Sequence, residues 1–151
     1  MKGILYVGFK GKNNSSFVLV NKINKDRYYL TNSFSGLKKD IDNLIVDDRL
    51  VIMFGLDKTL FNKIRFDLYA EKNGEKLKTN VDISEYVNKL KELDIDYYIS
   101  KNTTKYLCNE AYYHMLNKSE GNVIFIHIPS LPHMNEEFVE KLVEVFGFDN
   151  G

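Results

Sequence analysis

The chain has 151 residues, of which 44% are hydrophobic and 13% aromatic. A chain of this length can bury one hydrophobic core, so we expect a single domain spanning residues 1–151. Its 21 Lys and Arg residues balance its 21 Asp and Glu residues. This balance argues against a general electrostatic binder, so we expect no nucleic acid and no membrane surface as a partner.

Targeting signals and membrane spans are not recognisable in the sequence. The first eight residues carry one lysine and too short an apolar run for a signal peptide. No later run approaches the ~18 apolar residues of a membrane span. The single cysteine, Cys108, cannot form an internal disulfide, which fits a reducing compartment. We therefore expect a cytoplasmic protein in which the thiol of Cys108 is free.

Apolar runs flanked by polar residues alternate with segments of helical periodicity, which predicts an α/β fold. In chain order the pattern predicts strand 3–7, helices 17–23 and 37–44, strands 50–54 and 64–70, helix 83–93, strand 95–99, a helix from Cys108, strand 123–128 and helix 138–146. Strand 64–70 alternates apolar and polar residues and precedes Asn73-Gly74, so we expect it to be half exposed and to end in a turn. Asp82 or Ser84 can cap helix 83–93, and Asn135 can cap the last helix.

Cys108 lies where a strand and a polar loop give way to a helix. Free amide groups and the helix dipole at a helix start stabilise a thiolate, so with a cationic partner the pKa of the thiol can fall below its ordinary value of ~8.5. This hypothesis predicts rapid alkylation of Cys108 by iodoacetamide near pH 6.5. The alternative is a small buried residue in the first helical turn, because buried free cysteines are common.

His127 ends an apolar strand and precedes Pro129 and Pro132, which stop regular structure. Functional residues collect at the carboxyl ends of strands in open α/β sheets. A histidine there can accept a thiol proton and later protonate a leaving amine, although a structural, hydrogen-bonded histidine is the alternative. His114 and His133 have no motif around them and are interpreted as structural or solvent-facing. The histidines show no ligand spacing with Cys108, so we expect neither a metal nor a cofactor.

Two motifs occur in a specific order. Tyr106-Leu107-Cys108-Asn109 opens a helix after Ser100, and Phe125-Ile126-His127-Ile128-Pro129 with Pro132 ends a strand. They resemble the nucleophile and histidine motifs of the pyroglutamyl peptidase I (pyrrolidone carboxyl peptidase) family of cysteine peptidases. Gly8-Phe9 resembles the turn after that family's first strand, and Asn14 and Ser16 fit the start of its first helix more weakly. The expected fold is a three-layer α/β/α sandwich with a mostly parallel central sheet, phosphorylase/hydrolase-like.

The resemblance also suggests a third catalytic residue. Aligning residues 64–70 with the family's acidic motif places Asp67 where the family has glutamate, with a carboxylate one methylene shorter. Such a carboxylate holds the histidine in the tautomer that faces the thiol. The alternatives are that Asp67 is an exposed residue on a polar strand face, or that Glu71 is the acid. The resemblance thus implies a catalytic set of Cys108, His127 and Asp67.

Several positions depart from the family pattern. Of the two phenylalanines that bind the substrate ring, only Phe9 remains, as a candidate substrate-binding residue. Leu56 and Leu68 stand where many members have glutamine and arginine. Thr104 replaces a loop glycine, which makes a backbone conformation with positive φ before the nucleophile less accessible and affects the geometry of the oxyanion site. The segment 72–81 is shorter than in the family, so the site should be more open.

The motifs and the departures from them leave two hypotheses for the function of the chain. One is a cysteine hydrolase of the omega-peptidase type, related to enzymes that remove N-terminal pyroglutamate, acting on a peptide or small amide with altered specificity. The other is a non-catalytic binding or interaction protein that retains the fold. The retained Cys108, Asn109 and His127 favour the hydrolase. The family resemblance also allows a homo-oligomer.

Overall fold

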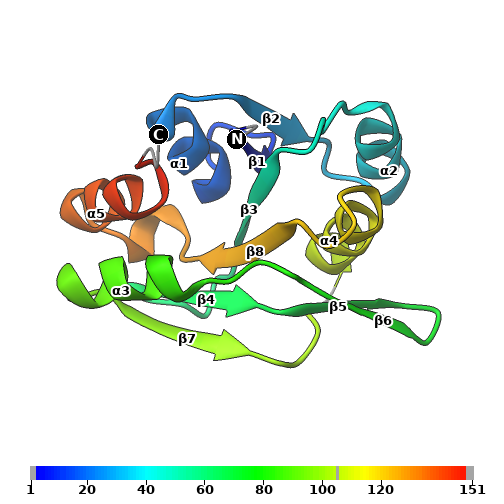
Figure 1. Ribbon diagram of the computed structural model, residues 1–151. Helices are drawn as coiled ribbons and strands as arrows, with labels where there is room; N and C mark the ends of the chain where they lie inside the picture. The colour runs from blue at the N-terminus through cyan, green and yellow to red at the C-terminus, as the bar shows by residue number, and fades with distance from the viewer. Residues whose placement is uncertain (1–2, 105, 149–151) are drawn as a thin grey trace.

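A mixed, mostly parallel sheet forms the centre of the computed structural model, which describes residues 3–104 and 106–148. The six strands have the order β2-β1-β3-β8-β4-β7 (Figure 1). Their bounds are β1 Ile4–Phe9, β2 Arg27–Leu30, β3 Leu50–Leu56, β4 Lys63–Asp67, β7 Asp96–Ser100 and β8 Val123–Ile128. The first four strands in spatial order run parallel to one another, whereas β4 is antiparallel to β8 and parallel to β7. The sheet therefore changes direction between β8 and β4.

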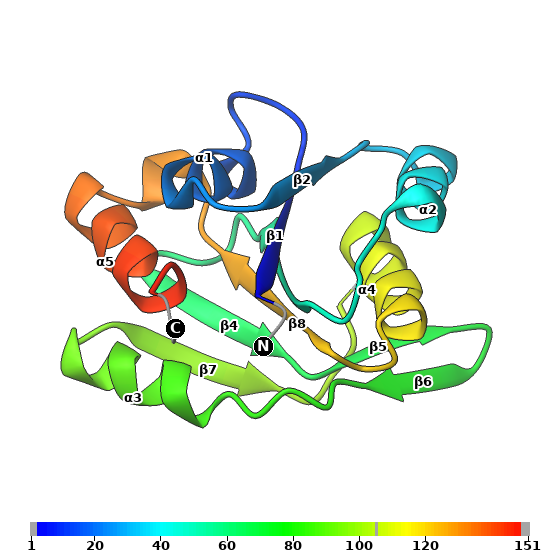
Figure 2. The same cartoon turned by 45° about the horizontal axis from the view of Figure 1, so that its top comes forward.

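Helices cover both faces of this sheet (Figures 1 and 2). One layer holds α1 Ser15–Ile23, α3 Ser84–Glu92 and α5 Glu136–Phe146, and the other holds α2 Phe34–Asn43 and α4 Tyr106–Lys118. A hairpin of β5 Tyr69–Lys72 and β6 Glu75–Lys78 packs against α4, and a 3-10 turn, Leu131–His133, precedes α5. This arrangement confirms the predicted α/β/α fold class. None of the helices in the described part of the chain is long and apolar enough to cross a membrane.

The central strands are apolar on both faces because each face has its own hydrophobic core. Ile52 and Phe54 of β3 belong to the core beneath α1, α3 and α5, whereas Val51 and Met53 belong to the core beneath α2 and α4. All four side chains are fully buried. Burial on both faces explains why these strands appear in the sequence as continuous apolar runs.

The prediction of one half-exposed strand over residues 64–70 is wrong. The structure ends β4 at Asp67 and begins β5 at Tyr69, in a second sheet. β4 lies between β8 and β7, and Asp67 is only 1% exposed. The alternation in the sequence indicated two different faces, but the polar face of β4 is largely shielded from solvent at Arg65 and Asp67. These two side chains are hydrogen-bonded to each other, and Asp67 is also bonded to buried His127. The predicted turn is confirmed, since Asn73 and Gly74 adopt φ angles of 52° and 81° between β5 and β6.

The predicted helix caps are confirmed for one helix and wrong for another. Asn135 caps α5 as predicted, because its side-chain oxygen accepts a hydrogen bond from the amide of Phe138 at 2.7 Å. Asp82 accepts from the amide of Ser84 at 3.0 Å, but the cap position of α3 is Ile83, which has no side-chain cap bond. The short strands β2 and β6 were not predicted. Both contain charged residues and lack an apolar run.

Candidate active site

The register of the sheet places four residues in one row across neighbouring strands. Gly55 of β3 pairs with His127 of β8, His127 pairs with Arg65 of β4, and Arg65 pairs with Tyr98 of β7. Directly paired residues point to the same face of a sheet. That face is the one covered by α2 and α4, because Phe125, two residues before His127, belongs to the core beneath these helices. The backbone register therefore gathers the residues of the candidate site.

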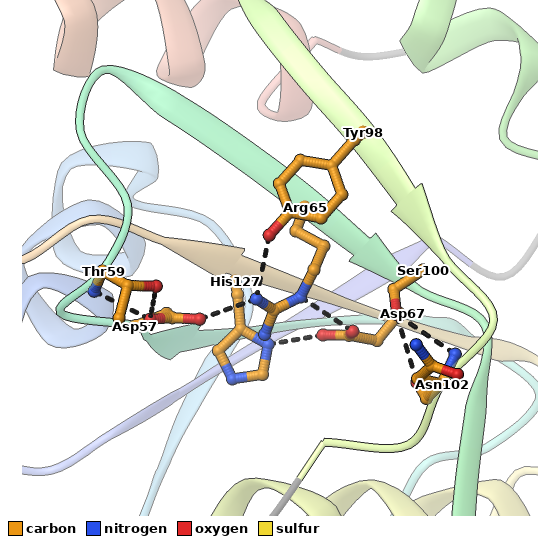
Figure 3. A network of polar contacts seen from close by, with 8 residues as sticks. All are labelled: Asp57, Thr59, Arg65, Asp67, Tyr98, Ser100, Asn102 and His127. Atoms are coloured by element: carbon orange, nitrogen blue, oxygen red, sulfur yellow. Dashed lines mark hydrogen bonds and ion pairs between the residues drawn. The ribbon is translucent and has the colours of Figure 1, made fainter.

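His127 and Asp67 form a buried hydrogen-bonded pair at the centre of this row (Figure 3). The ring nitrogen Nδ1 of His127 contacts Oδ2 of Asp67, and the two residues are 2% and 1% exposed. A carboxylate at Nδ1 favours the tautomer with the proton on that nitrogen. The other ring nitrogen, Nε2, is then available as a proton acceptor.

Arg65 connects this pair to a second carboxylate. Its Nε donates to Oδ1 of Asp67 at 3.0 Å, and its Nη1 donates to Oδ2 of Asp57 at 2.6 Å and to the hydroxyl of Tyr98 at 3.3 Å (Figure 3). Oδ1 of Asp57 accepts from the amide of Thr59 at 2.9 Å and from its hydroxyl at 2.7 Å. All four oxygens of the two carboxylates therefore have hydrogen-bond donors.

The charges in this network are stabilised by their partners. Burial by itself raises the pKa of Asp57, but the hydrogen bonds from Thr59 and the guanidinium of Arg65 outweigh this effect and lower the pKa to about 2. Burial likewise opposes the charge of Arg65, yet Tyr98 and the two carboxylates hold the pKa of the guanidinium above its ordinary value. The site thus contains a charged arginine between two carboxylates.

Cys108 lies in the first turn of α4, two residues after the helix begins. Its sulfur is 2.9 Å from the position that a Cβ atom on Gly55 would occupy, and the ring of Phe125 is 2.6 Å from the same position. The absence of a side chain at Gly55, the register partner of His127, therefore makes room for the sulfur. The structure brings Cys108 to the same part of the sheet as His127. Their direct contact stays a prediction, because no hydrogen bond joins them among the described residues.

The pKa of Cys108 is raised to about 12, so the predicted lowering of this pKa is wrong for the resting protein. Burial of the thiol is the main cause of the raised pKa, and the carboxylates of Asp67 and Asp57 raise it further. Arg65 opposes them but is outweighed. The thiol is therefore neutral at pH 7. Any nucleophilic attack must pass its proton to a base during the reaction.

This correction reverses the expected result of alkylation. At pH 7 iodoacetamide should label Cys108 at least about a hundredfold more slowly in the folded protein than in the urea-unfolded protein, because only the thiolate reacts. Labelling should accelerate as the pH rises well above 9. Mass spectrometry over time measures both rates. Rapid labelling of the folded protein at pH 6.5 would contradict the raised pKa.

The structure separates the two candidate acids. Glu71 lies in β5 with an exposed side chain, and its backbone is held by Asn109, whose side chain accepts from the amide of Glu71 at 3.0 Å and donates to its carbonyl at 2.7 Å. The carboxylate bonded to His127 belongs to Asp67. Asn109, which the sequence motif places after the cysteine, thus ties the first turn of α4 to the hairpin.

The positions of Phe9 and Thr104 do not test the roles predicted for them. Phe9 ends β1 and is 4% exposed in the core beneath α2 and α4, with its amide donating to the hydroxyl of Ser16 at 3.0 Å. Its role in substrate binding stays a prediction. Thr104, where a positive φ was expected to be less accessible, does not adopt one, whereas Tyr106, two residues before Cys108, has a φ of 60°. Lys105, between them, lies outside the described residues.

His114 and His133 lie apart from this network. His114 is hydrogen-bonded to Glu110 one turn earlier in α4 at 2.9 Å, and His133 contacts the carbonyl of Leu60 at 3.1 Å. Within residues 3–104 and 106–148, no group of three or more His, Cys, Asp or Glu side chains is arranged to hold a metal ion. These positions agree with the structural interpretation of both histidines.

Sequence reasoning missed Arg65, Asp57 and Tyr98. Arg65 and Asp67 are two residues apart on a strand, so they share a face, and this spacing was the available signal. Asp57 lies in the turn after β3 and Tyr98 on β7, and nothing local in the sequence joins them to Arg65. Their meeting depends on the order of strands in the sheet.

Comparisons with known proteins agree with this fold. No protein-family model and no curated protein matches the sequence. Among solved structures, pyrrolidone carboxyl peptidase from Thermus thermophilus has a TM-score of 0.78 at 17% identity over 95% of this chain and 96% of its own. The enzyme from Thermococcus litoralis gives 0.76 at 17% identity over 97% and 90%, and pyroglutamyl peptidase I from Bacillus amyloliquefaciens gives 0.79 at 15% identity over 97% and 94%.

The architecture is that of a three-layer α/β/α sandwich. Within that class, the chain has a pyroglutamyl peptidase-like fold that is highly divergent in sequence.

Proposed function

We propose that this protein is a cysteine hydrolase that cleaves an amide bond, with Cys108 as nucleophile, His127 as general acid and base, and Asp67 as the orienting carboxylate. The observation that carries the proposal is the buried hydrogen bond between Asp67 and His127. Gly55, the register partner of His127, leaves room for the sulfur of Cys108 beside this pair. The pyroglutamyl peptidase-like fold supports it.

In the proposed reaction each of the three side chains has a role. Asp67 holds the Nδ1 proton, so Nε2 of His127 accepts the thiol proton as the sulfur attacks the carbonyl carbon of the substrate. The imidazolium then protonates the leaving amine, and a thioester of Cys108 remains. Water hydrolyses this thioester with His127 again acting as base. Backbone amides in the first turn of α4 stabilise the oxyanion.

Removal of an N-terminal pyroglutamyl residue is the specific reaction that the structural neighbours support. Leu56 and Leu68 are apolar where that family has polar contacts, so the proposed specificity is altered. The raised pKa of Cys108 favours a second candidate, a non-catalytic binding protein. A neutral thiol is also compatible with catalysis, because the histidine can remove the proton during attack.

A fluorogenic pyroglutamyl amide, assayed beside a panel of other N-terminal amides, tests the proposal. We expect weak turnover of at least one amide and a mass increase at Cys108 equal to the acyl group in quenched samples. The matched variant Cys108→Ser should lose the turnover and the adduct. Silence across the whole panel, with no adduct, would favour the binding protein.

A further inference from the structure

Arg65 has a part in this site that the proposed reaction does not assign. It lies between His127 and Tyr98 in the row across the sheet, and its side chain is 14% exposed. Its guanidinium joins the carboxylates of Asp67 and Asp57, which come from β4 and from the turn after β3 (Figure 3). Arg65 thus links β4 to the turn after β3 through hydrogen bonds to a carboxylate on each.

The hydrogen bonds on Asp67 divide its two oxygens between two donors. Oδ1 accepts from Nε of Arg65, and Oδ2 contacts Nδ1 of His127. The backbone carbonyl of Asp67 accepts from the hydroxyl of Tyr112 at 2.7 Å, which fixes the end of β4. The remaining freedom is rotation of the carboxylate, and a donor fixed on Oδ1 determines where Oδ2 points.

Arg65 can fix this rotation because it is itself held. Asp57 accepts from its Nη1 at 2.6 Å, and the other oxygen of Asp57 is occupied by the amide and hydroxyl of Thr59. The hydroxyl of Tyr98 adds a third contact at 3.3 Å. The turn after β3 therefore fixes the position of Arg65, and Arg65 in turn fixes the orientation of the Asp67 carboxylate that contacts His127.

Arg65 also affects the nucleophile by its charge. The carboxylates of Asp67 and Asp57 raise the pKa of Cys108, and the guanidinium of Arg65 lowers it. Loss of Arg65 and loss of Asp57 should therefore shift the pH dependence of alkylation in opposite directions. Their effects on the orientation of Asp67 should have the same direction.

We propose that Arg65, held by Asp57, is a positioning residue that keeps Oδ2 of Asp67 directed at Nδ1 of His127 and thereby keeps Nε2 free to accept a proton. Its catalytic consequence rests on the proposed hydrolase function. Its consequence for the tautomer of His127 does not, because the tautomer can be measured without turnover.

Nitrogen-15 NMR of the three labelled histidines measures the tautomer, with His114→Gln and His133→Gln used to assign the signals. In the unchanged protein at pH 8.5, His127 should carry its proton on Nδ1. Arg65→Met should raise the ratio of the Nε2–H to the Nδ1–H form at least about tenfold, as expected for loss of a charge-assisted hydrogen bond. Arg65→Lys should raise this ratio less than Arg65→Met does, because the lysine ammonium can still donate to Asp67.

Asp57→Asn is the second variant, in case Arg65→Met does not fold. An asparagine has one acceptor oxygen for two sets of donors, Thr59 and Arg65, so it should loosen Arg65 and shift the tautomer ratio in the same direction. Arg27→Gln is the control, because Arg27 is exposed on β2 and donates to the side chain of Asn24 and the carbonyl of Lys25, outside the site. On an amide substrate, kcat should fall about tenfold in Arg65→Met with KM unchanged.

The outcomes separate the two proposals. An unchanged tautomer in both Arg65→Met and Asp57→Asn would overturn the positioning role, whatever the turnover. A shifted tautomer in a protein that cleaves no amide would support the positioning role and refute the hydrolase.

Discussion

Asp67→Asn should lower kcat for any amide that the protein cleaves by about 10²- to 10⁴-fold, with little change in KM. The reason is the set of donors around position 67. Arg65 always donates at one oxygen, so the single acceptor oxygen of asparagine should face Arg65. The amide NH₂ then faces Nδ1 of His127, which must lose its proton to accept. Nε2 would carry the proton and could not take another from Cys108.

The same variant should have an opposite effect on the thiol. The carboxylate of Asp67 raises the pKa of Cys108, so removing its charge should lower that pKa and speed alkylation by iodoacetamide at a fixed pH. Slower turnover with faster alkylation is the signature expected of a lost orienting group. Asp42→Asn, an exposed carboxylate paired with Lys38 on α2, is the control and should change neither rate. Turnover within twofold of the unchanged protein would mean that Asp67 does not orient His127.

The fold was predictable mainly where burial on both faces leaves a continuous apolar run. The strands around Val51 and Ile124 carry this signal, and the structure confirms them. The predicted strand around Ile99 is also confirmed, but it is an edge strand in which Ile99 is 44% exposed, so its apolar run does not reflect burial on both faces. β2 has one fully buried residue, Leu30, and β6 has none, so neither carries a sequence signal strong enough to predict a strand. These short strands depend on pairing with neighbours that are already in place.

The candidate site was predictable only where a motif linked residue type to position. Cys108, His127 and Asp67 were named from such motifs, and the structure joins the last two by a hydrogen bond. The direction of the Cys108 pKa was not predictable, because the helix start favours a thiolate whereas burial and nearby carboxylates oppose it. Arg65 and Asp57 were missed because the order of the strands brings them together.

Gly55→Ala should destabilise the fold by about 1–3 kcal/mol and lower turnover about a hundredfold. A Cβ at this position would lie 2.6 Å from the ring of Phe125 and 2.9 Å from the sulfur of Cys108. Phe125 is fully buried, with its ring centroid 5.4 Å from that of Tyr112 and 4.8 Å from that of His127. Neither the ring nor the sulfur can yield without moving the candidate nucleophile or base. Urea unfolding and the amide assay measure the two effects.

A double-mutant cycle isolates the contact with the sulfur. In a Cys108→Ala background the sulfur is absent, so Gly55→Ala should cost at least about 0.5 kcal/mol less in unfolding free energy than it does in the unchanged protein. Gly147→Ala is the control for steric strain alone, because its Cβ would lie 2.6 Å from the carbonyl of Val143 at the end of α5, on the opposite face of the sheet. That variant should lose stability but keep its turnover per folded molecule. Equal costs of Gly55→Ala with and without the sulfur would show that Cys108 does not occupy the space above Gly55.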